Sequence, residues 1–286
     1  MIDPSEPVFR FAPSPNGLLH LGHAYSALVN FEMSQAIYGR FLLRMEDIDT
    51  VRCSPAYEDQ IYDDLTWLGI TWEQPVRRQS DHFDAYQHAF EALESEALVY
   101  PFTLSRADLK RQVEAHEQAG DIWPRDPDGA PLAPPRQPDA DLHMDDIWPW
   151  RLDMKRALEI VRTPLHWHEF DLENEAKAPK LAEPERWGDV VITRKDTPTS
   201  YHLSVVVDDA LQGVTHVVRG KDLEQATAVH RLLQNLLGLQ APLYHHHDLV
   251  MAQDGRKLSK SNNDTSLKSL REAGMTPIDI RRMVGL

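Results

Sequence analysis

The sequence contains a single cysteine, Cys53, in 286 residues. One cysteine excludes an internal disulfide and any zinc site built from several cysteines, so we expect a reduced thiol. No stretch approaches the roughly 20 apolar residues that a membrane span requires, and the N-terminal residues lack the basic and then apolar pattern of a secretory signal. These absences predict a cytoplasmic protein that is not embedded in a membrane.

Positive charge is also scarce, because 30 lysines and arginines face 45 aspartates and glutamates, for a net charge of −15. Such an acidic chain disfavours non-specific attraction to nucleic acid, so an RNA partner would have to meet a local basic face. Two sets of residues are candidates for that face, although spaced charges are also typical of an ordinary solvated helix. They are Arg151, Arg156 and Arg162, and Lys268, Arg271, Arg281 and Arg282.

The stretch at residues 8–23 predicts a strand, a loop and a helix. Its apolar run at residues 8–11 gives way to a loop with two prolines and Gly17, after which apolar residues return at helical spacing. The small residue lets the backbone approach a ligand, and the helix N-terminus would present unpaired N–H groups to a phosphate. His20 and His23 would project to the same side and donate to phosphate oxygens. In isolation, such a pair is more often one helix cap and one surface residue.

A second cluster, at residues 254–261, reads Asp-Gly-Arg-Lys-Leu-Ser-Lys-Ser and follows an apolar strand expected at residues 249–251. Alone it would be read as a solvated turn. Together, His-Leu-Gly-His at 20–23 and Lys-Leu-Ser-Lys-Ser at 257–261 resemble the paired signatures of class I aminoacyl-tRNA synthetases, in the order and at the separation that a nucleotide-binding domain requires. The fold class that this implies is α/β, a Rossmann-like class I synthetase catalytic domain.

Further motifs resemble glutamyl-tRNA synthetases in particular. They are Arg-Phe-Ala-Pro-Ser-Pro at 10–15, Arg-Met-Glu-Asp-Ile-Asp at 44–49, Tyr-His-Leu at 201–203 and Val-Val-Arg-Gly at 217–220. The sequence ends soon after Lys260, where full-length members continue into domains that read the anticodon. The chain is therefore most similar to the glutamyl-Q tRNA(Asp) synthetases, truncated paralogues that attach glutamate to queuosine in the anticodon of tRNA(Asp). Val205 stands where discriminating glutamyl-tRNA synthetases tend to carry Asn, which points the same way.

The resemblance implies four segments. They are residues 1–100, the first half of the catalytic domain; 101–186, a proline-rich insertion of α/β or irregular structure that would bind an acceptor end or loop; 187–262, the second half; and 263–286, a short helical tail. Periodicity predicts helices at about 55–68, 82–96, 154–161 and 225–237, a turn and short extended piece at 69–72, and strands at 40–49, 190–194 and 215–220.

The activity that the resemblance implies is activation of L-glutamate by ATP, with Mg²⁺ bound to the nucleotide, and transfer of the glutamyl group to queuosine in the anticodon stem-loop of tRNA(Asp). The implied catalytic residues are His20, His23 and Lys260. Glutamate would be bound by Arg10, Phe11, Ala12, Pro13, Ser14, Glu46, Tyr201 and Arg219, and ATP by His20, Gly22, His23, Lys257, Ser259 and Lys260. Guanidinium groups suit the two carboxylates of glutamate, and a carboxylate suits its ammonium group.

One departure concerns metal. Many members of this family hold zinc with a Cys-x-Cys pair, and Phe102 and Leu104 stand at those positions. Neither can ligate zinc, so we expect no zinc and an apolar contact in its place. The run His245-His246-His247 also invites a metal interpretation, but neighbouring strand residues face opposite sides, so at most two could converge.

Two other functions stay open at this point. The chain could be a truncated glutamyl-tRNA synthetase that charges a tRNA 3′ end, or a catalytically silent binding module on the synthetase fold. The two intact signatures argue against the silent module. Arg10 and Arg219 could also be structural ion pairs within the sheet rather than ligand-binding groups.

Overall fold

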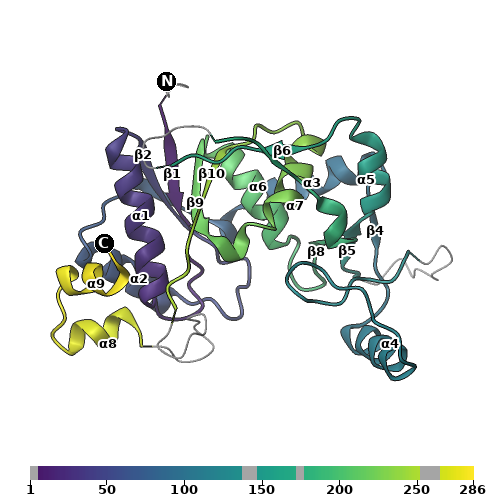
Figure 1. The fold of residues 1–286 in the computed structure, drawn as a ribbon, viewed down its shortest axis with the longest axis horizontal. Coiled ribbons are helices and arrows are strands. Elements are labelled where there is room, and N and C mark those ends of the chain that lie inside the picture. Colours follow the sequence, from purple (N-terminus) through teal and green to yellow (C-terminus); the bar gives the residue numbers. More distant parts are fainter. Residues whose placement is uncertain (1–5, 137–146, 172–176, 252–264) are drawn as a thin grey trace.

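The computed structural model describes residues 6–136, 147–171, 177–251 and 265–286 (Figure 1). A parallel sheet of five strands forms its centre, in the order β10-β9-β1-β2-β3. The strands are β1 (Val8–Phe11), β2 (Arg40–Met45), β3 (Glu73–Arg78), β9 (His216–Gly220) and β10 (Leu243–His247). Because β1 pairs with β2 on one side and with β9 on the other, the order of strands reverses beside β1. Ligands of open α/β sheets bind where the order reverses.

Helices cover both faces of this sheet (Figure 1). On one face lie α1 (Leu21–Ala36) and α2 (Pro55–Trp67), with the C-terminal α8 (Leu267–Glu272) and α9 (Pro277–Val284) packed against them. On the other lie α3 (Phe83–Ser95), α6 (Tyr201–Leu211) and α7 (Thr227–Leu236). Successive strand residues alternate between the two cores, since Val8 belongs to the core of the second face and Phe9 to that of the first.

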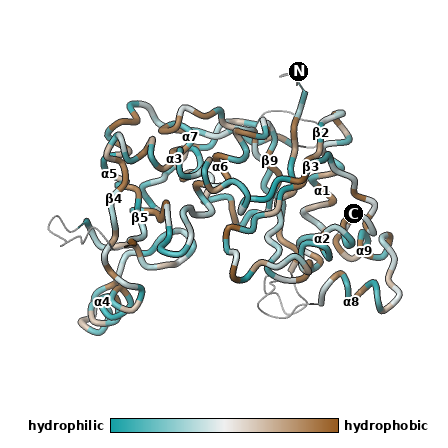
Figure 2. Tube along the Cα trace, turned by 180° about the vertical axis from the view of Figure 1, so that it is seen from behind, coloured by the Kyte–Doolittle hydropathy of each residue, from teal (hydrophilic) through white to brown (hydrophobic). Residues whose placement is uncertain are grey.

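The connection after α3 forms a smaller antiparallel sheet of β4 (Val99–Pro101), β5 (Trp150–Leu152) and β8 (Val191–Thr193). It also carries α4 (Arg106–Gln118), α5 (Met154–Ile160) and a two-stranded ribbon, β6 (His166–Trp167) with β7 (Lys180–Leu181). Figure 2 shows α4 standing away from the main body, with hydrophilic residues along much of its length. The limits of the four predicted segments stay a prediction.

Most predicted elements lie where the sequence placed them, but three differ. The extended piece expected at 69–72 lies at 73–78 and joins the sheet as the edge strand β3. Its charged residues and proline, which are typical of edge strands, obscure the apolar pattern by which a strand is predicted. The strand expected at 40–49 ends earlier, at Met45, whereas the strand expected at 190–194 is present as β8 and pairs with β5 in the small sheet. The strand expected at 249–251 comes earlier, as β10. None of the described helices is long and apolar enough to cross a membrane.

A buried ion network joins α6 to the central sheet. Asp208, fully buried on α6, accepts hydrogen bonds from Arg77 Nε at 2.7 Å, Gln79 Nε2 at 2.8 Å and the Tyr86 hydroxyl at 2.9 Å. The guanidinium of Arg44, also fully buried, has its Nε 3.7 Å from Asp208 Oδ2. The second and third strands and α3 are thereby tied to one carboxylate.

Replacing Asp208 by Asn tests this network. The substitution keeps the shape of the side chain but leaves Arg44 and Arg77 beside a neutral amide, and we expect the free energy of unfolding to fall by about 3 kcal/mol. Urea unfolding measures the change. Glu114→Gln, which removes a carboxylate paired with Lys110 on the exposed surface of α4, is the control and should change stability by less than about 1 kcal/mol. Equal losses in the two variants would contradict a stabilising role for the network.

Candidate active site

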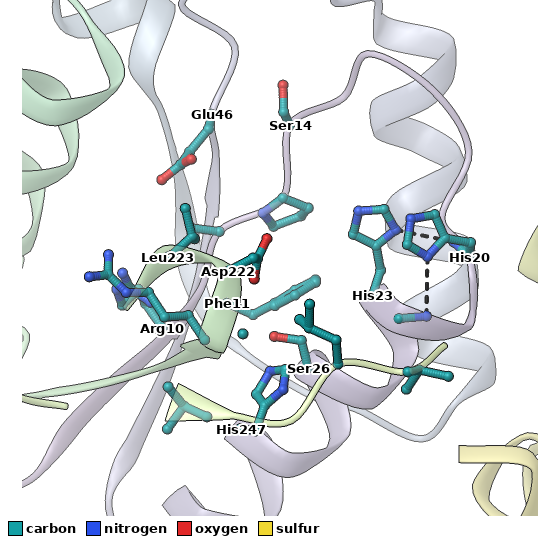
Figure 3. A pocket seen from close by; sticks show the side chains of 18 of the residues that line it. Arg10, Phe11, Ser14, His20, His23, Ser26, Glu46, Asp222, Leu223 and His247 are labelled. Atoms are coloured by element: carbon teal, nitrogen blue, oxygen red, sulfur yellow. Dashed lines mark hydrogen bonds between the residues drawn. The ribbon is translucent and has the colours of Figure 1, made fainter. Parts of the chain in front are cut away.

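A cavity of about 540 Å³ opens at the carboxyl ends of β1, β2, β9 and β10, beside the point where the strand order reverses (Figure 3). It brings together residues from across the sequence that were predicted to bind glutamate or the nucleotide. These are Arg10, Phe11, Ala12, Pro13, Ser14, Glu46, Tyr201 and Arg219, and His20, Gly22 and His23. The shared cavity gives their positions, while their individual roles stay predictions. Lys257, Ser259 and Lys260 lie outside the described residues.

The two histidines form the N-terminal cap of α1. His20 is the N-cap residue, and its Nδ1 accepts the N–H of Gly22 at 3.1 Å, while the N–H of His20 donates to Nδ1 of His23 at 3.2 Å (Figure 3). An imidazole whose Nδ1 is an acceptor carries its proton on Nε2, so each neutral ring is a donor through Nε2. Both rings take part in the helix cap and both line the cavity, so the alternative of one cap and one surface residue does not describe this pair.

Gly22 leaves room for the His20 ring. A Cβ at this position would lie 3.0 Å from Cε1 of His20, so a larger residue would require the imidazole to shift by a few tenths of an ångström. The chain also returns to this point after the segment that contains Lys260, since Ser266 pairs with His20 as an isolated bridge and Leu267 N–H donates to Leu19 O at 2.8 Å. On the other side of that segment, Val250, one residue before the last described residue, lines the cavity.

Arg10 and Glu46 are both held by the ion pair between Arg44 and Asp209. Arg10 Nε donates to Asp209 Oδ1 at 3.0 Å, and Arg44 donates to the same oxygen at 2.8 Å. Arg44 also donates to Glu46 Oε1 at 3.3 Å. Burial raises the pKa of Glu46, and the opposing influence of Arg44 and Arg10 does not cancel it. Arg10 therefore forms a structural ion pair and also lines the cavity. A structural role and a ligand-binding role for this residue are not mutually exclusive.

Arg219 is buried in the cavity wall with neutral partners. Its three nitrogens contact His246 Nε2 at 3.3 Å, His230 Nδ1 at 3.2 Å and Thr227 Oγ1 at 2.7 Å. Burial, and then the charge of Arg219, lowers the pKa of His230 well below its ordinary value, so this histidine is neutral at physiological pH. Within the part of the chain that the structure describes, no carboxylate pairs with Arg219. A desolvated guanidinium among neutral groups favours an anionic ligand.

Glu169 orients this arginine through His246, and the sequence did not indicate it. Its Oε1 lies 2.8 Å from His246 Nδ1 and 2.8 Å from Lys180 Nζ, which also bonds Glu224 at 2.6 Å. Because the Glu169 carboxylate accepts a hydrogen bond from Nδ1–H of His246, Nε2 of His246 is left to accept one from Arg219. Burial raises the pKa of Glu169, but the hydrogen bonds from His246 and Lys180 outweigh it and bring it to about 2.

The histidine run of β10 makes separate contacts and not a metal centre. His245 Nδ1 lies 3.0 Å from Phe170 O, His246 contacts Glu169, and His247 lines the cavity. In the described ranges, no three His, Cys, Asp or Glu side chains are grouped to hold a metal ion.

The positions where relatives of this type would carry zinc ligands do not fit zinc. Phe102 is buried, and the Arg151 guanidinium lies 4.4 Å from the centre of its ring, so the contact is cation–π and not the purely apolar one expected. Arg151 also donates to Asp189 O at 2.6 Å, and burial lowers its pKa. Arg151 is half-buried, and its place on an RNA-binding face stays a prediction. Arg281, another candidate for that face, pairs with Glu32.

The chain matches known proteins over most of its length. Residues 8–286 match the family described as class I tRNA synthetases (E and Q), catalytic domain. A glutamyl-Q tRNA(Asp) synthetase of Rhodobacter capsulatus is 44% identical over 98% of this chain and 100% of its own length. Glutamate–tRNA ligase 2 of Jannaschia is 35% identical over 95% of this chain, which spans 58% of that relative.

Solved structures show the same fold. The crystal structure of a glutamate–tRNA synthetase from Elizabethkingia anophelis superposes with a TM-score of 0.71 at 26% identity, covering 91% of this chain and 53% of that one. Methionyl-tRNA synthetase of Mycobacterium tuberculosis, at 13% identity and a TM-score of 0.53, covers 98% of this chain and 64% of that one and shares the fold alone. The predicted α/β class and its parallel central sheet are thus confirmed.

Glu169→Gln tests how this carboxylate contributes to stability. A carboxyl whose folded pKa is lowered stabilises the protein above its ordinary value of 4.5, and this contribution is lost as the pH falls towards about 2. We expect the variant to be less stable than the wild type by up to about 3 kcal/mol at pH 6, with the difference shrinking as the pH falls below 4.5. Denaturant unfolding at pH 6, 5, 4 and 3 measures it.

Proposed function

The chain belongs to the catalytic-domain family of class I tRNA synthetases for glutamate and glutamine, and from this premise we propose that it joins L-glutamate to queuosine in the anticodon of tRNA(Asp). Membership of the family implies the use of ATP. The observation that carries the amino-acid assignment is Arg219, a buried guanidinium with neutral partners that faces the same cavity as Glu46. The acceptor is assigned from the relative that this chain covers from end to end.

Glutamate fits the charges of the cavity. It carries two carboxylates and one ammonium group, and the cavity offers the guanidinium groups of Arg10 and Arg219 and the carboxylate of Glu46. Arg10 contacts Asp209 through Nε and Nη2, so among the described residues its Nη1 is not engaged. Each charge of the ligand would thus meet an opposite charge that is already desolvated and held in place.

The first step is acyl activation. An oxygen of the glutamate α-carboxylate attacks the α-phosphorus of ATP, a new O–P bond forms in line with the bond that breaks, and pyrophosphate leaves with its Mg²⁺. His20 and His23 would donate from Nε2 to phosphate oxygens, and the N-terminus of α1 adds its positive dipole end. Lys260 would add a further positive charge. Positioning and electrostatic stabilisation account for most of the rate in transfers of this type.

The second step is transfer to RNA. A hydroxyl of the cyclopentene-diol of queuosine attacks the carbonyl carbon of glutamyl-adenylate, AMP leaves with the electron pair of the broken C–O bond, the hydroxyl proton passes to a phosphate oxygen of the leaving AMP, and an ester forms. An anticodon loop suits a crevice of this kind, because unstacked loop bases can enter a pocket and be read at their edges.

Arg219→Gln tests the amino-acid site. We expect kcat/KM for glutamate to fall by about 10²-fold or more, because a buried anion would lose its charged partner, a loss of about 2–5 kcal/mol. ATP–pyrophosphate exchange at varied glutamate concentration, with RNA present, measures this. Arg231→Gln is the matched control, because Arg231 on α7 donates to His166 O and Gln234 outside the cavity. Unchanged kinetics in the Arg219 variant would remove this arginine from the site.

Labelled glutamate offered to two RNAs tests the acceptor. We expect transfer to an anticodon stem-loop of tRNA(Asp) that contains queuosine and no transfer to the same stem-loop with guanosine at that position. Glutamylation that requires the 3′-terminal adenosine and ignores queuosine would establish a truncated glutamyl-tRNA synthetase instead. Absence of both transfer and pyrophosphate exchange would establish the silent binding module.

A further inference from the structure

Two histidines lie side by side behind the wall of the catalytic cavity, on neighbouring helices. His230 is on α7, and His202 is the second residue of α6. Their ring centres are 5.3 Å apart, and Nδ1 of His202 lies 3.1 Å from Nε2 of His230. His230 is buried, His202 is half-buried, and neither side chain lines the cavity. The two rings are therefore joined by a hydrogen bond that a ligand in the cavity does not touch.

The guanidinium of Arg219 determines where the protons of both rings lie. Because a guanidinium can only donate, Nδ1 of His230, 3.2 Å from Nη1 of Arg219, is an acceptor. His230 is neutral, so its one ring proton is on Nε2 and is donated to Nδ1 of His202. Burial, Arg219 and Arg194 lower the pKa of His202 to about 4, so this ring is neutral too and carries its proton on Nε2. Only this assignment of protons satisfies all three groups.

The two rings support Arg219 without adding negative charge. Within the described ranges, neither ring is hydrogen-bonded to a carboxylate, whereas His246, on the other side of Arg219, contacts Glu169. A second proton on either ring would place one N–H against another, either between the two rings or between His230 and Arg219. The pair therefore offers Arg219 a lone pair and leaves its positive charge undiminished.

Arg219 keeps two N–H groups for a ligand. Of the five N–H groups of a guanidinium, three are engaged here by His246, His230 and Thr227. In the part of the chain that the structure describes, this leaves one N–H on each terminal nitrogen, and the side chain lines the cavity. A carboxylate can accept from both at once. If His230 carried its proton on Nδ1 instead, that N–H would oppose Nη1 and the guanidinium would have to turn.

The same two rings pack against Tyr201, another residue of the cavity wall that was predicted to bind glutamate. The centre of the Tyr201 ring lies 5.7 Å from that of His230 and 5.6 Å from that of His202, in edge-on contacts. Two side chains that face the ligand are therefore supported from behind by one pair of imidazoles. Arg219 is held through a hydrogen bond and Tyr201 through ring contacts.

We propose that His202 is a positioning residue for the choice of amino acid. As a neutral acceptor it fixes the proton of His230 on Nε2, so that Arg219 meets the ligand with its whole charge and its two remaining N–H groups. The proposal rests on the proposed function, and it adds a residue outside the cavity that sets the preference for glutamate over glutamine.

Three substitutions of His202 separate hydrogen bonding, charge and size. His202→Asn keeps a neutral acceptor, His202→Leu removes it, and His202→Asp has the size of asparagine but adds a negative charge. ATP–pyrophosphate exchange, with RNA present, gives kcat and KM for glutamate, glutamine and ATP. Calorimetry gives the affinity for each amino acid, and circular dichroism checks that each variant is folded.

We expect the leucine variant to raise KM for glutamate about 10-fold or more while KM for ATP is unchanged, because a group that orients a binding residue is lost. The asparagine variant should stay within about 3-fold of the wild type. The aspartate variant should lower the ratio of kcat/KM for glutamate to that for glutamine by about 10-fold, because its charge opposes that of Arg219.

His216→Leu is the matched control. His216 is another buried histidine, but it packs against Phe9 and Phe170 in the core on the opposite face of the sheet. This variant should lose stability and keep the wild-type ratio of glutamate to glutamine.

Nitrogen-15 shifts of the imidazole rings test the protons directly and need no activity. In the wild type at neutral pH we expect both rings to carry their proton on Nε2, with signals assigned by comparison with the single variants. His230 should keep this form in the asparagine variant and lose it in the leucine variant.

Four results would each overturn the proposal. They are wild-type kinetics in the leucine variant, equal losses in the leucine and asparagine variants, equal ratios in the asparagine and aspartate variants, and a proton on Nδ1 of His230 in the wild type. If the wild type exchanges pyrophosphate but the variants behave alike, the function stands and His202 is excluded. If the wild type binds glutamate in preference to glutamine but exchanges no pyrophosphate, the proposed function falls, and the binding ratios of the variants decide the role of His202.

Discussion

Two adjacent carboxylates on α6, Asp208 and Asp209, hold together the part of the sheet on which the catalytic cavity is built. Asp209 binds Arg10 and Arg44, which come from neighbouring strands, while Asp208 receives hydrogen bonds from the third strand and α3. Sliding α6 would leave several buried charges without partners, which is far more unfavourable than breaking an exposed pair. The same contacts position Arg10 and, through Arg44, Glu46, so two side chains of the cavity wall are oriented by the network that fixes the fold.

The sequence predicted the parts of this protein that depend on local patterns. Helices α1, α2, α3 and α7 follow from apolar spacing, and strands β1, β2 and β9 follow from apolar runs. The candidate site was predicted from the resemblance of its motifs to those of glutamyl-tRNA synthetases. These motifs meet in the fold because they lie at strand ends, and the carboxyl ends of parallel strands meet at one edge of a sheet. Residues as distant as Arg10 and Arg219 could therefore be assigned to one cavity before any contact was known.

What the sequence could not supply depends on distant partners. Strand β8 looks like a strand of the central sheet, but its pairing with β5 is decided by tertiary contacts. Helix α4 buries only Val113, so it has no apolar stripe, and its capping box at Ser105 and Asp108 was the one local signal. Glu169 contacts His246 across 77 positions of sequence, and no motif near either residue predicts this contact.

A protein with a net charge of −15 can bind anionic substrates, because its net charge acts far from the surface and ligand binding depends on charges within the cavity. Net charge governs the field far from the surface, where salt screens it within about 10 Å. We expect binding to depend on the few cations that have already lost their water, such as Arg219, which is 5% exposed. The guanidinium of Arg219 lost its water when the chain folded, so an incoming carboxylate does not have to displace that water. A neutral group in place of the carboxylate would leave the buried guanidinium without an anionic partner. Selection by the cavity is therefore electrostatic before it is steric.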